Sequence, residues 1–243
     1  MLTQAVILAA GTGTRLRPLT DDRPKCLVEV GSHTILSRLL HQLATAGIKR
    51  ALLTTGYRAE AIARHLAEHP APLEVVLIPN PVYDTTNNAM SLFKAHQATK
   101  GEGFILCDGD VVLRRGPLQA LLQEVCECAL LVEAKQNMGA EEMKAVVDSS
   151  HKVTQLAKTL DPSLCLGESI GIQKIGTTFA PLLWKTLSDM MQAGRDGAYY
   201  EEAFQRMIDH GVDFAATPVA ASDWTEIDDL ADLEDARARF ADA

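Results

Sequence analysis

The glycine-rich segment from Ala9 to Lys25 constrains this chain more than any other part of its sequence. It follows an apolar run at residues 5–8, which is typical of a buried first strand. Gly11 and Gly13 lack side chains, so backbone N–H groups there can approach an anion closely. Cations then cluster at Arg15, Arg17, Arg23 and Lys25. A strand, a glycine turn and clustered cations together predict a polyphosphate-binding loop.

Two familiar phosphate-binding motifs are excluded by spacing. A Rossmann dinucleotide fingerprint needs a third glycine three positions after Gly13, where this chain has Leu16. A P-loop needs Gly-Lys-Ser/Thr after four spacer residues, and the segment contains no such run. The polyphosphate must therefore be held by another kind of loop.

The pattern G-x-G-T-R-x-R-P followed by P-K resembles the signature of the nucleotidyltransferases, a family within the sugar-nucleotidyltransferase superfamily. Its members join a nucleoside triphosphate to a phosphorylated small molecule. The resemblance implies direct attack by an acceptor oxygen on the α-phosphorus and release of pyrophosphate. It also implies that Arg15 stabilises the β- and γ-phosphates, while Lys25 bridges the α-phosphate and the acceptor phosphate.

The rest of the chain predicts one α/β domain. Strand-like and helix-like patterns alternate, which favours a Rossmann-like fold with a mostly parallel central sheet flanked by helices. We expect a single nucleotidyltransferase domain over residues 1–243, with a nucleotide-binding part at about 1–134 and 220–243. Residues 135–220 are expected to form a small acceptor or lid insertion, as the resemblance implies.

Composition limits the partners. A net charge of −9 argues against nucleic acid or an anionic membrane as the main partner. No run approaches the roughly 18–20 apolar residues of a membrane span, and the N-terminus lacks a signal-peptide pattern. We therefore expect a cytoplasmic protein, a monomer or homodimer, with its five cysteines reduced. The seven histidines show no clustered ligand spacing and are expected to lie mostly on the surface.

Carboxylates at two distant places are candidates for a metal site. Asp108-Gly109-Asp110 follows a predicted strand, and ligands bind at the carboxyl ends of strands in open α/β sheets. Asp228 stands just before a predicted closing helix. The resemblance implies that Asp110 and Asp228 together hold Mg²⁺, with Glu226 as a weaker candidate. Taken alone, Asp228 would be a helix N-cap and Asp108 a turn residue.

Residues 80–92 form the pattern N-x-x-Y-x-x-x-N-N-x-x-S-L, which resembles cytidylyltransferases that act on phosphocholine and related phosphonates. An amide can pair with a pyrimidine edge, so Asn88 and Ser91 are candidate cytosine contacts. Capping of the following helix is the alternative. The nucleotide site implied by the resemblance comprises Leu8, Ala9, Ala10, Gly11, Thr12, Gly13, Thr14, Asn88, Ser91 and Asp108.

The acceptor pocket has weaker sequence signs. Glu168, Tyr199 and Glu201 stand out between apolar runs, and an aromatic ring with carboxylates can hold an ammonium group. Packing of the tyrosine and solvation of the glutamates are the alternatives. Lys144 is the candidate second lysine for the acceptor, with surface exposure as its alternative.

The sequence therefore predicts a Mg²⁺-dependent enzyme that moves a cytidylyl group from CTP to a small alcohol phosphate or phosphonate. Two alternatives stay open. One is a sugar-1-phosphate nucleotidyltransferase that uses UTP, dTTP or GTP. The other is a catalytically silent nucleotide-binding subunit.

Overall fold

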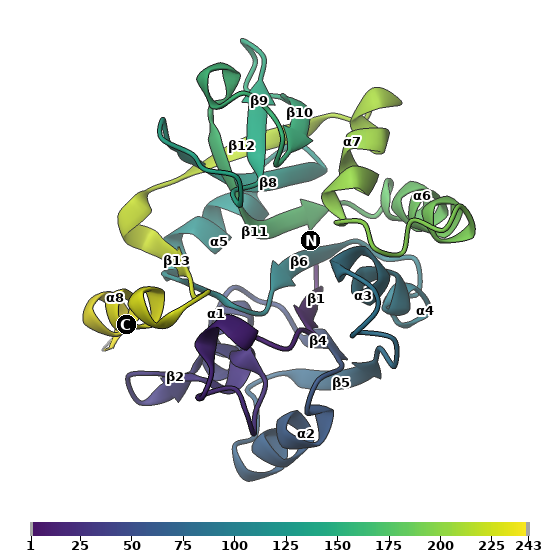
Figure 1. Ribbon diagram of the computed structural model, residues 1–243. Coiled ribbons are helices and arrows are strands. Elements are labelled where there is room, and N and C mark those ends of the chain that lie inside the picture. The colour runs from purple at the N-terminus through teal and green to yellow at the C-terminus, as the bar shows by residue number, and fades with distance from the viewer. Residues whose placement is uncertain (1, 242–243) are drawn as a thin grey trace.

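A computed structural model describes residues 2–241 as a single α/β domain built on one nine-stranded sheet (Figure 1). The strand order is β10-β9-β11-β6-β1-β4-β5, with β8 added to β11 and β12 added to β8. Among the described strands of this sheet, only β10 and β11 run against the others. The predicted fold class, with a mostly parallel sheet, is therefore confirmed.

The N-terminal half supplies the parallel part of the sheet. It consists of β1 (Gln4–Ala9), β4 (Arg50–Thr55), β5 (Glu74–Pro79) and β6 (Phe104–Asp108). Alternate residues of β1 enter two different cores, because successive side chains of a strand point to opposite faces. Val6 and Leu8 pack on one face and Ala5 and Ile7 on the other, so both faces need helices. The predicted strands at 5–8, 51–53, 73–78 and 104–107 are all present.

Helices cover both faces of the sheet. One core includes side chains of α1 (Ile35–Thr45), α2 (Ala59–Glu68) and α5 (Arg115–Gln123). The opposite core includes side chains of α3 (Asn88–Lys94), α6 (Ala180–Gln192) and α7 (Glu201–Asp209). The short α4 (His96–Thr99) follows α3. In Figure 1, α3, α4, α6 and α7 lie together on the right of the sheet.

The C-terminal half adds five strands to the sheet, two of which are antiparallel to the others. They are β8 (Cys128–Ala134), β9 (Lys144–Val147), β10 (Val153–Ala157), β11 (Gly167–Ile175) and β12 (Phe214–Val219). β11 is antiparallel to β6 and to β8, and its register with β8 shifts between Ser169 and Gln173. β9 and β10 form the upper end of the molecule in Figure 1, beyond the parallel strands.

A separate two-stranded ribbon pairs a C-terminal segment with the segment that follows Asp108-Gly109-Asp110. β7 (Val111–Leu113) pairs with β13 (Trp224–Glu226), so that Glu226 lies opposite Val111. α8 (Leu230–Phe240) follows and begins with a capping box in which Asp229 and Asp232 satisfy the first N–H groups. Its apolar side packs with Leu16 and with the hairpin of β2 (Glu29–Val30) and β3 (His33–Thr34). This ribbon places two distant sequence segments side by side.

All five cysteines are free thiols, as expected. Among residues 2–241, every helix is too short or too polar to cross a bilayer.

Candidate active site

The glycine loop connects β1 to two short 3₁₀ turns, η1 (Thr14–Leu16) and η2 (Lys25–Leu27). Gly13 has φ of 59°, a left-handed conformation that favours glycine. A Cβ atom at this position would lie 3.0 Å from the Cβ of Lys25. The missing side chain therefore lets Lys25 pack directly against the loop.

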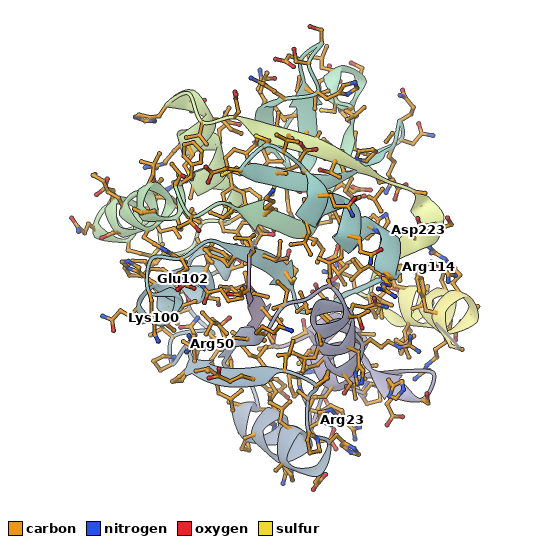
Figure 2. All side chains as sticks on the ribbon, turned by 180° about the vertical axis from the view of Figure 1, so that it is seen from behind. Arg23, Arg50, Lys100, Glu102, Arg114 and Asp223 are labelled. Carbon is orange, nitrogen blue, oxygen red and sulfur yellow. The ribbon has the colours of Figure 1, made fainter. Side chains whose placement is uncertain are left out.

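The clustered cations of this motif separate in space. Arg15 and Lys25 line a large cleft, about 690 Å³ in volume. Arg17 pairs with Asp21 at 3.4 Å, and Arg23 pairs with Asp22 at 3.0 Å. Figure 2 shows Arg23 at the lower edge of the molecule, pointing to solvent. Of the four cations, Arg15 and Lys25 are therefore the two that line the cleft.

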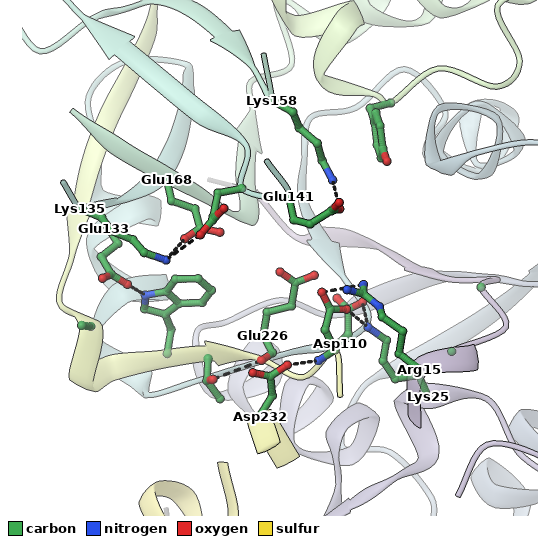
Figure 3. A pocket seen from close by; sticks show the side chains of 18 of the residues that line it. Arg15, Lys25, Asp110, Glu133, Lys135, Glu141, Lys158, Glu168, Glu226 and Asp232 are labelled. Atoms are coloured by element: carbon green, nitrogen blue, oxygen red, sulfur yellow. Dashed lines mark hydrogen bonds and ion pairs between the residues drawn. The ribbon is translucent and has the colours of Figure 1, made fainter. Parts of the chain in front are cut away.

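Three carboxylates from distant segments meet in this cleft. Donor atoms of Asp110, Glu226 and Asp228 all lie within 4.8 Å of one another. The ribbon of β7 and β13 explains the meeting, because the N–H of Ile227 also donates to the carbonyl of Asp110 at 3.1 Å. Asp110 and Asp228 were predicted as partners, and the structure brings them together along with the weaker candidate Glu226 (Figure 3).

Lys25 is enclosed by the two predicted metal ligands. Its Nζ lies 2.7 Å from Oδ2 of Asp110 and 2.7 Å from Oδ1 of Asp228. Burial alone would lower the pKa of Lys25, but these carboxylates outweigh burial and hold it above its ordinary value. Arg15 pairs with the other oxygen of Asp228 at 2.8 Å. Although burial opposes it, Lys25 and then Arg15 keep the pKa of Asp228 low. Lys25 is therefore a cation and Asp228 an anion at neutral pH.

The carboxylate cluster also has the properties of a divalent-cation site. Oδ1 of Asp110 is buried without a hydrogen-bond partner, although its other oxygen binds Lys25. Desolvation in the cleft, followed by the charges of Asp110 and Asp228, raises the pKa of Glu226 to about 8. Carboxylate oxygens from three residues and a spare oxygen on Asp110 suit a hard cation such as Mg²⁺, which prefers oxygen ligands. The residues present therefore fit such an ion.

A second cavity of about 230 Å³ adjoins the glycine loop. It is lined by Leu8, Ala10, Gly11, Asn88, Ser91 and Asp108, all of which were predicted to contact the nucleotide. Of the other predicted loop residues, Gly13 and Thr14 line the large cleft, and Ala9 lines a smaller adjoining hollow. Thr12 lies between these positions on the loop. The structure thus gathers the predicted nucleotide site around one strand end.

Asn88 and Ser91 are not the caps of the following helix. The N-cap is Asn87, whose side chain accepts from the N–H of Asn88 at 2.8 Å. Oδ1 of Asn88 accepts from the N–H of Tyr200 at 2.8 Å, while its Nδ2 has no hydrogen-bond partner within residues 2–241. Oγ of Ser91 accepts from the Asn80 amide at 3.1 Å. Asn88 therefore offers a cavity ligand two amide hydrogens.

Asp108 belongs to a hydrogen-bonded network with Tyr200 and Gln173. The Tyr200 hydroxyl donates to its Oδ2 at 2.9 Å, and Gln173 donates to that hydroxyl at 3.0 Å. Burial, followed by the charges of Asp110 and Glu201, raises the pKa of Asp108 well above its usual range. Gly171 has φ of 76°, and a Cβ there would lie 2.6 Å from Oδ2 of Asp108. This glycine lets the bulge of β11 approach the carboxyl group.

The remote part of the large cleft is acidic and aromatic. Glu168 pairs with Lys135 at 3.1 Å, and the Trp224 indole N–H donates to Glu133 at 2.6 Å. Nζ of Lys158 lies 4.6 Å from the ring centre of Tyr199. Figure 3 shows these charged side chains converging on the cleft from the side opposite Arg15 and Lys25. Sequence reasoning included Glu168 and Tyr199 but missed three residues that line this region, Lys135, Lys158 and Trp224.

Lys144 does not share this position. Its side chain is 2% exposed, and its Nζ donates to the backbone carbonyls of Lys158 at 2.6 Å and Glu142 at 3.3 Å. It does not line the large cleft, although it lies opposite Glu168 in the pairing of β9 with β11. Neither is it on the surface, which was the alternative expectation. Lys144 instead holds the loop that carries Lys158.

Glu201 is a buried carboxyl group at the rim of a small hollow that also contacts Tyr199 and Asp108. Its side chain accepts no hydrogen bond at Oε2, and burial raises its pKa from 4.5 to about 7. The unfolded chain ionises this group above pH 4.5, whereas the folded chain keeps it protonated to about pH 7. Its contribution to stability is therefore lost as pH rises through this window.

We expect Glu201→Gln to remove that loss. The free energy of unfolding of the variant, relative to the original protein, should rise by roughly 3 kcal/mol between pH 4.5 and pH 8. Denaturant unfolding across this pH range measures the difference. Glu202→Gln is the control, because Arg195 and Arg206 lower the pKa of Glu202 despite some burial. A difference for Glu201→Gln that does not change with pH would contradict the argument.

Comparisons with known proteins agree with this geometry. The sequence model of a family described as nucleotidyl transferase matches residues 4–138. The 2-aminoethylphosphonate cytidylyltransferase of Lancefieldella rimae is 25% identical over 232 residues, which cover 95% of this chain and 90% of that protein. The UTP–glucose-1-phosphate uridylyltransferase AglF of Haloferax volcanii is 50% identical over 62 residues, or 26% of each chain.

The fold is also found among solved structures. The CTP:phosphocholine cytidylyltransferase of Streptococcus pneumoniae superposes with a TM-score of 0.81 at 22% identity. The superposition covers 98% of this chain and 99% of that one.

Proposed function

This chain belongs to the nucleotidyl transferase family, and on that premise we propose that it transfers a cytidylyl group from CTP to a small phosphate or phosphonate that carries an ammonium group. The products would be pyrophosphate and a CMP-linked acceptor. One observation carries the proposal: Arg15 and Lys25 face a carboxylate cluster between a nucleotide-sized cavity and an acidic, aromatic pocket.

In this reaction an oxygen of the acceptor attacks the α-phosphorus of CTP, and the bond to the bridging oxygen of pyrophosphate breaks. Two anions must approach each other, so positioning and charge neutralisation would supply most of the rate. Lys25 would contact both anions, and Arg15 would neutralise the β- and γ-phosphates. Each would exchange its carboxylate partner for phosphate oxygens.

Asp110, Asp228 and Glu226 would hold Mg²⁺. When bound, the ion would neutralise charge that accumulates on the phosphate oxygens. Protonated Glu226 must lose its proton to become a ligand, so we expect metal affinity to increase as pH approaches 8.

Different parts of the chain would bind the nucleotide and the acceptor. Residues 1–134 and 220–243 would hold the nucleotide, and residues 135–220 would supply most of the acceptor pocket. Glu133, Glu141, Glu142 and Glu168 outnumber Lys135 and Lys158 there, which favours a cationic acceptor over a neutral sugar. Trp224 and Tyr199 add ring faces suited to an ammonium group. Because Lys158 covers the ring of Tyr199, an ammonium at that face would replace it.

Asn88 favours cytosine over uracil. Its free amide group offers two donors, and O2 and N3 of cytosine are both acceptors. Uracil carries a hydrogen on N3, which would oppose an amide hydrogen. This supports CTP over UTP.

We expect Asn88→Ala to reduce the ratio of kcat/KM for CTP over UTP by about tenfold, the effect of losing one good hydrogen-bond contact. Steady-state kinetics with each nucleotide measures this ratio. Thr85→Ala, an exposed change in the same loop, should leave it unaltered. An unchanged ratio in Asn88→Ala would remove the assignment of the base contact.

The proposed activity is tested by Mg²⁺-dependent pyrophosphate release. CTP, UTP, dTTP, GTP and ATP would each be paired with phosphocholine, 2-aminoethylphosphonate, a polyol phosphate and glucose-1-phosphate. We expect release with CTP and an ammonium-bearing acceptor, and at least tenfold less with ethylphosphonate, which lacks the ammonium. Release with UTP and glucose-1-phosphate would instead support the sugar alternative, which the local similarity to a uridylyltransferase favours.

A catalytically silent protein is disfavoured. Such a relative would be expected to have lost a cation or a carboxylate, whereas Arg15, Lys25, Asp110 and Asp228 all line the cleft.

A further inference from the structure

A separate cavity, about 380 Å³ in volume, shares no lining residue with the large cleft. It lies among the β2–β3 hairpin, α1 and the end of α2, and Figure 1 shows β2 and α2 at the lower end of the molecule. Four of the seven histidines of the chain line it, namely His33, His41, His65 and His69. Six of the seven histidines are exposed, as expected, but three separate segments bring these four together.

The two pairs of imidazole rings are close. His65 and His69 are four residues apart at the end of α2, with ring centres 4.8 Å apart. His69 is the C-cap residue just outside α2, and the i, i+4 spacing still brings the two rings close, as it does for the histidine pairs on a helix that bind zinc. The rings of His33 and His41 lie 6.1 Å apart.

Ser37 connects the two pairs. Its hydroxyl lies 2.9 Å from Nε2 of His65, and its backbone carbonyl lies 2.9 Å from Nδ1 of His41. A carbonyl oxygen only accepts, so Nδ1 of His41 carries the hydrogen and Nε2 of the neutral ring has a free lone pair. Metal-binding histidines commonly donate their other N–H to a backbone carbonyl in this way. His41 is therefore prepared to act as a ligand through Nε2.

The charged residues that line the cavity favour a cation over an anion as its ligand. Its lining includes Glu29 and Glu68 but neither lysine nor arginine, so a phosphate or another anion would find no permanent positive charge there. Burial, and then the neighbouring His69, lower the pKa of His65, which favours the neutral imidazole that a metal requires. Neutral imidazoles suit Zn²⁺, Ni²⁺ and Cu²⁺ rather than Mg²⁺.

We propose that this cavity is a binding site for a transition-metal ion of the Zn²⁺ class, held by His65 and His69 and completed by His41 or His33. Within residues 2–241, three donor atoms within 4.8 Å of one another occur only at the carboxylate cluster, so the proposed site requires a side-chain rotation that brings a third nitrogen to His65 and His69. His33 and His41 are both exposed: the His33 side chain forms no hydrogen bond within residues 2–241, whereas His41 is held through Nδ1 by Ser37 and would coordinate through Nε2. The bound ion would join α1 and the β2–β3 hairpin to α2 and so stabilise the folded state.

The test is calorimetric titration of the full chain with Zn²⁺ in the presence of excess Mg²⁺. The His65→Ala/His69→Ala double variant should bind one equivalent of Zn²⁺ fewer than the original protein. The His151→Ala/His210→Ala double variant is the matched control, because those histidines lie outside the cavity. Zn²⁺ should also raise the melting temperature of the original protein and of the control, but not that of the His65→Ala/His69→Ala variant.

Equal Zn²⁺ stoichiometry in all three proteins would overturn the proposal, as would absence of Zn²⁺ binding by the original protein. If the double variant fails to fold, the exposed single change His69→Ala serves instead. That variant should bind Zn²⁺ at least about tenfold more weakly, since even changes behind the ligands have such effects. Unchanged affinity in His69→Ala would then overturn the proposal.

Discussion

Replacing Lys25 by alanine is expected to lower kcat by about 10²–10³-fold, the effect of removing one preorganised group that stabilises developing charge. Lys25 is placed against the glycine loop by Gly13 and aimed at the cleft by two carboxylates at 2.7 Å. Alanine cannot neutralise an α-phosphate, and without Lys25 the carboxylates of Asp110 and Asp228 repel the substrate more strongly. Steady-state pyrophosphate release with saturating CTP measures the loss.

Arg23→Ala is the matched control for this change. Arg23 belongs to the same run of cations but pairs with Asp22 at the surface, and its side chain is 46% exposed. Its substitution should leave kcat within about twofold, because a surface ion pair contributes little. Equal losses in the two variants would contradict the separation of the four cations that the structure shows.

Asp110→Asn is expected to lower Mg²⁺-dependent turnover by about 10²–10³-fold, since a catalytic metal contributes several kcal/mol and each 1.36 kcal/mol is a factor of ten. Asp110 is central to the cluster because Oδ1 lacks a protein partner while Oδ2 holds Lys25. Titration with Mg²⁺ at fixed CTP should show a large increase in the Mg²⁺ concentration needed for half-maximal activity.

The control is Asp223→Asn, a carboxylate at the surface near Arg114 (Figure 2). It precedes the same ribbon, β13, but lies outside the cluster, so its Mg²⁺ response should match that of the original protein. Full Mg²⁺-dependent activity in Asp110→Asn would show that the acidic cluster does not hold the metal.

The sequence predicted the parallel part of the fold well because local patterns determine it. The apolar run of β1 and the helical spacing of α1 can each be recognised within a short stretch of sequence, and the glycine loop between them is a local motif. Asp110 and Asp228 were paired through the family resemblance, but their contact depends on the β7–β13 ribbon, which the sequence did not indicate. Three-residue strands are too short for periodicity to reveal.

The acceptor pocket was harder for a related reason. Lys135, Lys158 and Trp224 come from β8, the segment after β10 and β13, so only the tertiary fold brings them together. Lys144 was favoured because it begins a strand, yet its side chain turns into the fold and binds two carbonyls. A position on a strand gives no information about which neighbours a long side chain will reach. The histidine cavity escaped detection likewise, because its rings belong to three elements.

The most direct test of the central claim is identification of the product. The protein would be incubated with CTP, 2-aminoethylphosphonate and Mg²⁺, and the mixture analysed by mass spectrometry and ³¹P NMR. The proposed reaction predicts a CMP-linked phosphonate and an equimolar amount of pyrophosphate, with no product from UTP under the same conditions. A nucleotide-linked sugar formed from UTP and glucose-1-phosphate, without a CMP-linked phosphonate or phosphocholine, would contradict the claim.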